Sequence, residues 1–102
     1  MLTSENFDGK TGSGVHVVDF SATWCGPCKA LKPSVEKLEK EYENRVGIHT
    51  VDIDGAKPLV ERFSIKSVPT IIFLKDGGEV GRHVGFISYE ALKDKIEDAI
   101  RK

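Results

Sequence analysis

The chain has little cysteine, no excess of charge of either sign and no long apolar run. None of its apolar stretches approaches the roughly 20 residues that a membrane-spanning helix needs, and residues 1–9 lack a basic segment followed by an apolar one. Its 15 basic and 16 acidic residues leave a net charge of -1, which provides no electrostatic excess for binding nucleic acid. The sequence therefore predicts a cytoplasmic protein with no membrane anchor and no nucleic-acid partner.

The length and composition fit a single globular domain. Hydrophobic residues make up 39% of the 102 residues and charged residues 30%, a balance typical of folded domains rather than disordered chains. The chain is too short for two independent cores, and its only flexible stretch is the short segment 9–14. We expect residues 1–102 to form one domain that acts as a monomer.

Apolar periodicity predicts that strands and helices alternate along the chain. Runs rich in β-branched residues predict strands over 15–20 and 46–53, and a hairpin of 70–74 and 79–86 that turns at 76–78. Helices are expected after each of the first two strands and after the hairpin. This order predicts an α/β fold with a central mixed sheet of four to five strands and helices on both faces.

The expected helices carry apolar stripes and recognisable ends. The first has one apolar face, formed by Leu31, Val35, Leu38 and Tyr42. Pro33 lies inside this helix and should kink it, because proline has no N–H to donate. Asp54 is expected to cap a short second helix that places Leu59, Val60 and Phe63 on one side, and Ser88 is expected to cap the last helix.

The only two cysteines, Cys25 and Cys28, are separated by two residues. As a structural staple they would close a loop so small that it contributes only about 2 kcal/mol. A structural zinc site needs four ligands, and the only histidines, His16, His49 and His83, lie in separate strand patterns with none paired to another. Neither a staple nor a metal site explains this placement well, and we predict no metal.

A redox couple accounts for the position of the cysteines between a strand and a helix. Cys25 lies where unpaired N–H groups and the helix dipole favour a thiolate, and Cys28 follows one turn later on the same face. We expect Cys25 to attack a disulfide and Cys28 to resolve the mixed disulfide. Gly26 permits close approach of a partner, and Pro27 is tolerated in the first helical turn.

These motifs closely resemble the thioredoxin family. The resemblance covers "ATWCGPCK" (22–29), the preceding "VVDF" (17–20), Pro33, "SVPT" (67–70) and "VG" (84–85). It implies a thioredoxin fold and a protein that reduces disulfides in target proteins without a bound cofactor of its own. The implied partners are those targets and a thioredoxin reductase, an FAD-containing enzyme that uses NADPH.

Asp19 interrupts an apolar strand, where burying a carboxylate is costly unless its pKa rises or it finds a partner. The alternative is an aspartate at a strand end that faces water. The family resemblance implies that Asp19 is the buried acid that takes and returns the proton of Cys28.

The resemblance also implies a substrate-binding surface around Cys25. Pro69 stands where the family has a cis-proline, which would leave the backbone of Val68 free to pair with an extended substrate segment. The implied apolar collar, named here the substrate collar, consists of Trp24, Gly26, Pro27, Val68, Pro69, Val84, Gly85 and Phe86.

Two positions and one segment depart from the family pattern. Ser21 stands where many members have tryptophan, which predicts a less bulky floor beneath the motif. Thr50 stands where many have lysine, so the pKa of Asp19 should be less depressed. The short segment before Val15 predicts that the family's first strand and helix are abbreviated or irregular.

The sequence is also compatible with two other functions. The fold could serve as a binding module with incidental thiols, and the collar would then be its interface. The couple could also act as a thiol oxidant or isomerase, although Gly26 and Pro27 between the cysteines favour a reductant by family resemblance.

Overall fold

The computed structural model describes residues 2–102 and contains one four-stranded mixed sheet. The strands lie in the spatial order β2-β1-β3-β4; β1 and β2 are parallel, whereas β3 is antiparallel to both β1 and β4. Their bounds are β1 Val15–Ser21, β2 Val46–Asp52, β3 Thr70–Lys75 and β4 Gly78–Val84. This arrangement confirms the predicted α/β fold with its mixed sheet.

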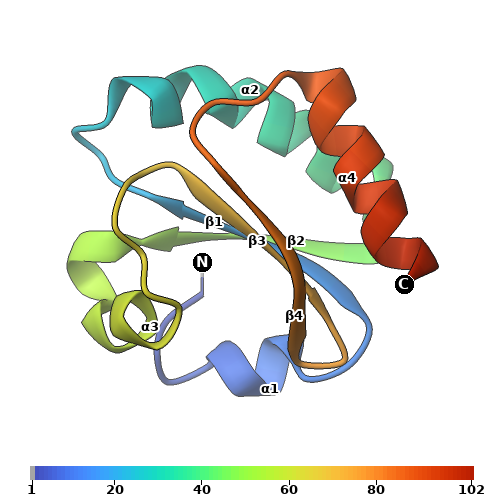
Figure 1. Cartoon of the computed structure of the whole chain (residues 1–102), viewed down its shortest axis with the longest axis horizontal. Coiled ribbons are helices and arrows are strands. Elements are labelled where there is room, and N and C mark those ends of the chain that lie inside the picture. Colours follow the sequence, from blue (N-terminus) through green and yellow to red (C-terminus); the bar gives the residue numbers. More distant parts are fainter. Residues whose placement is uncertain (1) are drawn as a thin grey trace.

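Helices cover both faces of the sheet (Figure 1). The longer pair, α2 (Gly26–Glu41) and α4 (Tyr89–Arg101), packs on one face, where Val17 and Phe73 contribute to a shared apolar cluster. The short helices α1 (Phe7–Thr11) and α3 (Lys57–Arg62) pack on the other. None of the helices among residues 2–102 has the length and apolar character to cross a bilayer.

Strand β1 lies in the middle of the sheet and is buried on both faces. Val18 and Phe20 pack toward α1 and α3, whereas Val17 packs toward α2. Because successive side chains of a strand point to opposite faces, Asp19 and Ser21 share the face of Val17. The alternation therefore places a carboxylate beneath the N-terminal half of α2.

The apolar stripe of α2 and the N-terminal cap of α4 agree with the sequence predictions. Leu31, Val35 and Leu38 are buried along α2, and the hydroxyl of Ser88 accepts the N–H of Ala91 at 3.2 Å. Pro33 lies inside α2 and does not end it; the kink stays a prediction.

The predicted cap at Asp54 is wrong. A 3-10 turn, Ile53–Gly55, precedes α3, and the N-cap residue Ala56 makes no side-chain capping bond. Asp52 instead accepts the N–H of Asp54 at 3.0 Å and caps the 3-10 turn. The extra turn leaves the carboxylate of Asp54 free for the contact with Trp24 described below.

The hairpin and the N-terminal segment also follow the predictions, with one shortened strand. Asp76 and Gly77 adopt positive φ values of 51° and 87° in the turn, as hairpins with two-residue loops prefer. Strand β4 ends at Val84 rather than Phe86, because Gly85 takes φ 97° and turns the chain away. Before Val15 the described residues hold a five-residue helix and no strand.

The expectation that no histidine pairs with another is wrong. His16 Nδ1 lies 2.9 Å from His49 Nε2, and His16 Nε2 lies 2.8 Å from the carbonyl oxygen of Ser13. Burial, followed by the charge of His16, lowers the pKa of His49 to about 4. Among residues 2–102 no group of three or more His, Cys, Asp or Glu side chains could hold a metal ion. The pair is therefore a structural contact between β1 and β2.

Gly47 makes room for this histidine pair. A Cβ at this position would lie 2.7 Å from His16 Cε1 and 2.8 Å from His49 Nε2, inside normal contact distance. We expect Gly47→Ala to lower the free energy of unfolding by about 1–3 kcal/mol, measured by urea denaturation. With His16→Ala already present, the same substitution should cost much less, and an equal cost in both backgrounds would contradict the steric explanation.

Candidate active site

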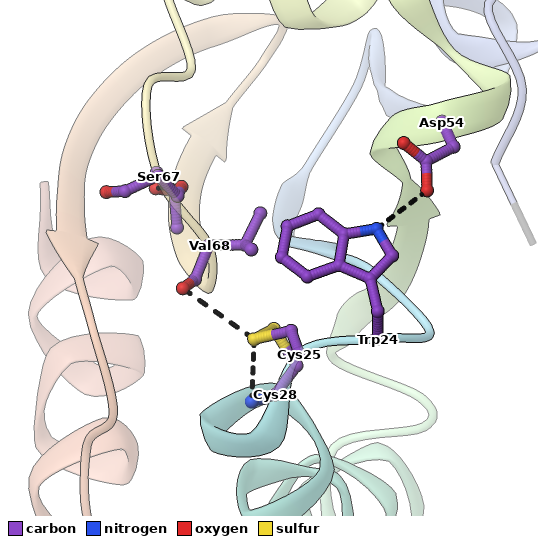
Figure 2. The surroundings of a disulfide bond; sticks show 7 residues. Trp24, Cys25, Cys28, Asp54, Ser67 and Val68 are labelled. Atoms are coloured by element: carbon purple, nitrogen blue, oxygen red, sulfur yellow. Dashed lines mark hydrogen bonds between the residues drawn. A yellow bond between two sulfur atoms is a disulfide. The ribbon is translucent and has the colours of Figure 1, made fainter.

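Cys25 and Cys28 form a disulfide at the start of α2, as Figure 2 shows. Cys25 is the N-cap of the helix in an extended conformation, and its sulfur accepts the backbone N–H of Cys28 at 3.2 Å. Pro27 occupies the first turn, where its missing N–H leaves no intrahelical bond unmade. The first sulfur thus takes the place of the oxygen that usually caps a helix.

The loop before β3 brings a backbone carbonyl to the same sulfur. The peptide bond between Val68 and Pro69 is cis, which confirms the family expectation. Cys25 Sγ lies 3.7 Å from the carbonyl oxygen of Val68 (Figure 2). Thr70 holds this loop by donating its hydroxyl to the carbonyl of Ser67 at 2.7 Å. Residues about 40 positions apart in the chain therefore meet at Cys25.

Exposure does not distinguish the two cysteines. In the disulfide form Cys25 is 5% exposed and Cys28 is 4% exposed, because Ala22 and Val68 pack around both. The asymmetry lies in hydrogen bonding instead. Cys25 Sγ accepts an N–H at the helix start, whereas Cys28 lies inside the first turn.

This asymmetry predicts unequal reactivity in the reduced protein. An N–H donor and the positive end of a helix dipole stabilise a thiolate, so Cys25 should react with iodoacetamide at pH 7 at least about tenfold faster than Cys28. Timed alkylation followed by peptide mass spectrometry measures both rates. Equal rates would contradict the roles assigned to the two sulfurs.

Exposed apolar side chains lie next to Cys25 in sequence, at Trp24, and at the end of β4, where the Gly85 N–H donates to the carbonyl of Pro69 at 2.8 Å. Trp24 is 65% exposed, and Val84 and Phe86 are also mostly exposed. The indole N–H of Trp24 donates to Asp54 Oδ2 at 3.0 Å, which holds the ring beside Cys25 (Figure 2). Of the other predicted collar residues, Gly26 and Pro27 are exposed, Val68 and Gly85 are half-buried and Pro69 is buried.

Asp19 lies beneath α2, on the floor of the sheet side of the cavity that Cys28 also lines. It is 4% exposed, which rules out an aspartate at a strand end facing water, and its Oδ1 makes no hydrogen bond. Burial raises the pKa of Asp19 to about 6. Asp19 and Cys28 both line one cavity.

The family departures at Ser21 and Thr50 explain why that cavity is open. Its volume is about 480 Å³, and Ser21 and Thr50 both line it. The parallel register places Thr50 directly opposite Asp19 and Asp52 opposite Ser21. No large side chain fills the space between β1, β2 and α2, as the small residue at position 21 predicts.

Comparison with known proteins identifies the family. The thioredoxin family model matches residues 1–98. A thioredoxin of Staphylococcus saprophyticus is 43% identical over 96 residues, which cover 94% of this chain and 92% of that protein. A thioredoxin of Staphylococcus aureus is 41% identical over the same share of both chains. The chain belongs to the thioredoxin family.

Family membership agrees with the fold and with the paired cysteines. The four-stranded mixed sheet flanked by helices is consistent with a thioredoxin fold, and Cys25 and Cys28 form a disulfide with a Cα–Cα distance of 5.3 Å. The chain is therefore a thioredoxin-type dithiol-disulfide oxidoreductase that works by thiol-disulfide exchange. Thioredoxins carry no cofactor of their own.

The sequence did not reveal every contact of this thioredoxin site. Asp54 supports Trp24 from the turn after β2, 30 residues away. The only local signal was an aspartate with no partner nearby in sequence, and that signal favoured a helix cap. Thr50 was recognised only by family comparison, and its position opposite Asp19 became clear from the strand register.

Proposed function

We propose that Cys25 is the nucleophile and Cys28 the resolving thiol in the reduction of target disulfides. The Cys25 thiolate attacks one sulfur of the target disulfide, forms a mixed disulfide and displaces a target thiolate. The Cys28 thiolate then attacks Cys25 Sγ, closes the internal disulfide and releases the second target thiolate. Two electrons pass to the target. The observation that carries this order is the hydrogen bond from the Cys28 N–H to Cys25 Sγ.

Asp19 is the proposed proton acceptor for Cys28. A buried thiol one turn inside the helix needs a nearby base before it can attack as a thiolate. Asp19 lines the same cavity as Cys28, and burial gives its carboxyl group a pKa of about 6. This value suits a group that takes up and releases a proton near neutral pH.

The substrate collar is the proposed binding surface for the target. Exposed apolar side chains beside a reactive sulfur favour an extended peptide with apolar residues next to its cysteine. The proximity of the Val68 carbonyl to Cys25 supports backbone pairing at that position. The proposed binding residues are Trp24, Val68, Pro69, Val84, Gly85 and Phe86, with Gly26 and Pro27 allowing close approach.

We further propose that residues 1–102 act as one monomeric domain in the cytoplasm, with disulfide-containing proteins as targets. A thioredoxin reductase would restore the dithiol with electrons from NADPH through its FAD. A reducing compartment fits this role, because the couple transfers electrons only while it is kept reduced.

Two measurements test the proposed function. With NADPH and a bacterial thioredoxin reductase, the chain should catalyse reduction of insulin disulfides, followed by NADPH consumption. Its midpoint potential, measured against glutathione redox buffers, should be more reducing than about -200 mV. A midpoint more oxidising than about -180 mV would indicate an oxidant or isomerase. Partner binding that is indifferent to redox state, without insulin reduction, would indicate a binding module.

A further inference from the structure

The cavity beside Asp19 has the features of a ligand site distinct from the substrate collar. It lies between α2 and the strands β1 and β2, where β2 is an edge of the sheet. Figure 1 shows α2 crossing this face of the sheet. Its volume of about 480 Å³ falls within the range of small-molecule sites in proteins. The exposed collar residues Trp24, Val84 and Phe86 do not line it.

The floor of the cavity holds a carboxylate oxygen without a partner. Asp19 is 4% exposed, and its Oδ1 accepts no hydrogen bond from the protein. An unsatisfied buried acceptor is costly, and most such groups in proteins are paired. That oxygen is itself closed to solvent, so a ligand can reach only the small part of Asp19 that lines the cavity beside the small side chains of Ser21 and Thr50.

The charges around the cavity favour a cation over an anion. Lys29 and Lys32 line the wall formed by α2. The carboxylates that line the cavity are Asp19, Glu36, Glu39 and Asp52. Four carboxylates against two ammonium groups give the lining a formal charge of -2 when all are ionised. Val35 and Ala22 add an apolar wall.

We propose that this cavity binds a small organic cation whose amidinium or guanidinium group donates hydrogen bonds to Asp19. Such a planar cation presents several N–H donors, one of which can bond the part of the Asp19 carboxyl group that lines the cavity. A short apolar body behind the cation would lie against Val35 and Ala22. This inference goes beyond the proposed function, because binding requires neither a target disulfide nor a reductase.

Benzamidine is a suitable probe because it joins an amidinium group to a compact apolar ring. Titrated into the oxidised, 15N-labelled protein at pH 7.5, it should give saturable amide shifts at Ser21 and Thr50, with a dissociation constant of about 1 mM or tighter. Benzoate, its anionic counterpart, should bind at least about tenfold more weakly. No saturation by about 20 mM, or equal binding of benzoate, would overturn the proposal.

Variants locate the binding site. Asp19→Asn should weaken benzamidine binding at least about tenfold, whereas Asp94→Asn, at an exposed position of α4, should leave it unchanged. Ser21→Trp should also prevent binding by filling the cavity. Unchanged affinity in both Asp19→Asn and Ser21→Trp would overturn the proposal. If one of the two variants is poorly folded, unchanged affinity in the other variant alone would overturn it.

The pH dependence of benzamidine binding is an independent test of the contact with Asp19. Since the pKa of Asp19 is about 6, lowering the pH from 7.5 to 5 should weaken binding by about tenfold as the carboxylate is protonated. The groups that share the cavity are Lys29, Lys32, Glu36, Glu39 and Asp52, so the same pH step on D19N measures their contribution. An equal loss in D19N would contradict the contact with Asp19. Failure here with intact insulin reduction would leave the proposed function standing.

Discussion

Cys25→Ser is expected to reduce the rate of insulin reduction by at least about 10³-fold. A serine hydroxyl at the start of α2 would not form a mixed disulfide, so the first covalent step is lost. The side chain at this position also accepts the N–H of Cys28, a role that serine can keep. The variant should therefore fold normally, and its circular dichroism should match that of the wild type.

Cys28→Ser should fail at the next step instead. It retains the nucleophile but has no resolving thiol, so one equivalent of target should remain attached to Cys25. Non-reducing mass spectrometry would detect this adduct, and dithiothreitol should release it. Full insulin reduction by both single variants would contradict the redox function itself. A trapped adduct on Cys28 in the Cys25→Ser variant would reverse the proposed roles.

Asp19→Asn should stabilise the oxidised protein by about 3 kcal/mol at pH 7. Burial raises the pKa of Asp19 from 3.8 to about 6, and a difference of this size in pKa corresponds to about 3 kcal/mol. The folded state therefore incurs this cost whenever Asp19 is ionised. An asparagine of nearly the same shape carries no charge and avoids most of it.

The pH dependence of this stabilisation has a definite sign. A raised pKa means that the folded state binds the proton more tightly than the unfolded state. The contribution of Asp19 to stability is therefore most favourable below about pH 4, and it declines as the pH rises to about 6. The difference between D19N and the wild type should be near zero at pH 3.5 and reach its full size above pH 7.

Urea unfolding at several pH values measures this difference. Asp94→Asn, a change at an exposed aspartate of α4, should shift stability by less than about 0.5 kcal/mol at each pH. A pH-independent effect of Asp19→Asn would contradict desolvation as its cause.

In stopped-flow reduction of insulin, the same variant should resolve mixed disulfides on the order of 10²-fold more slowly. An unchanged rate would remove Asp19 from the proposed proton transfer.

Much of the fold was predictable because local signals agree with the tertiary structure. The β-branched run at 15–20, the apolar stripe of α2 and the Asp76-Gly77 turn each have one favourable conformation. The end of β4 was misplaced by two residues, because Gly85 has the freedom to leave the strand. Sequence patterns alone contain no signal for that choice.

The contacts that sequence analysis missed depend on strand register. His16 and His49 meet only because β1 and β2 pair in parallel with Val18 opposite His49. One residue of slippage would turn the rings to opposite faces of the sheet. The same register places Thr50 opposite Asp19, so the small residue at position 21 predicted a reduced floor but not the cavity that both strands share.

The active cysteines enclose only two residues, and this short span limits how far a structural change can extend from the disulfide when the redox state changes. Cys25 and Cys28 belong to one helical turn, with a Cα–Cα distance of 5.3 Å, and the N-cap bond already fixes their backbone. Opening the disulfide therefore gives the backbone little additional conformational freedom. The oxidised and reduced forms should therefore differ in structure only near the disulfide. A partner that distinguishes the two forms must then contact the sulfurs and the collar around them.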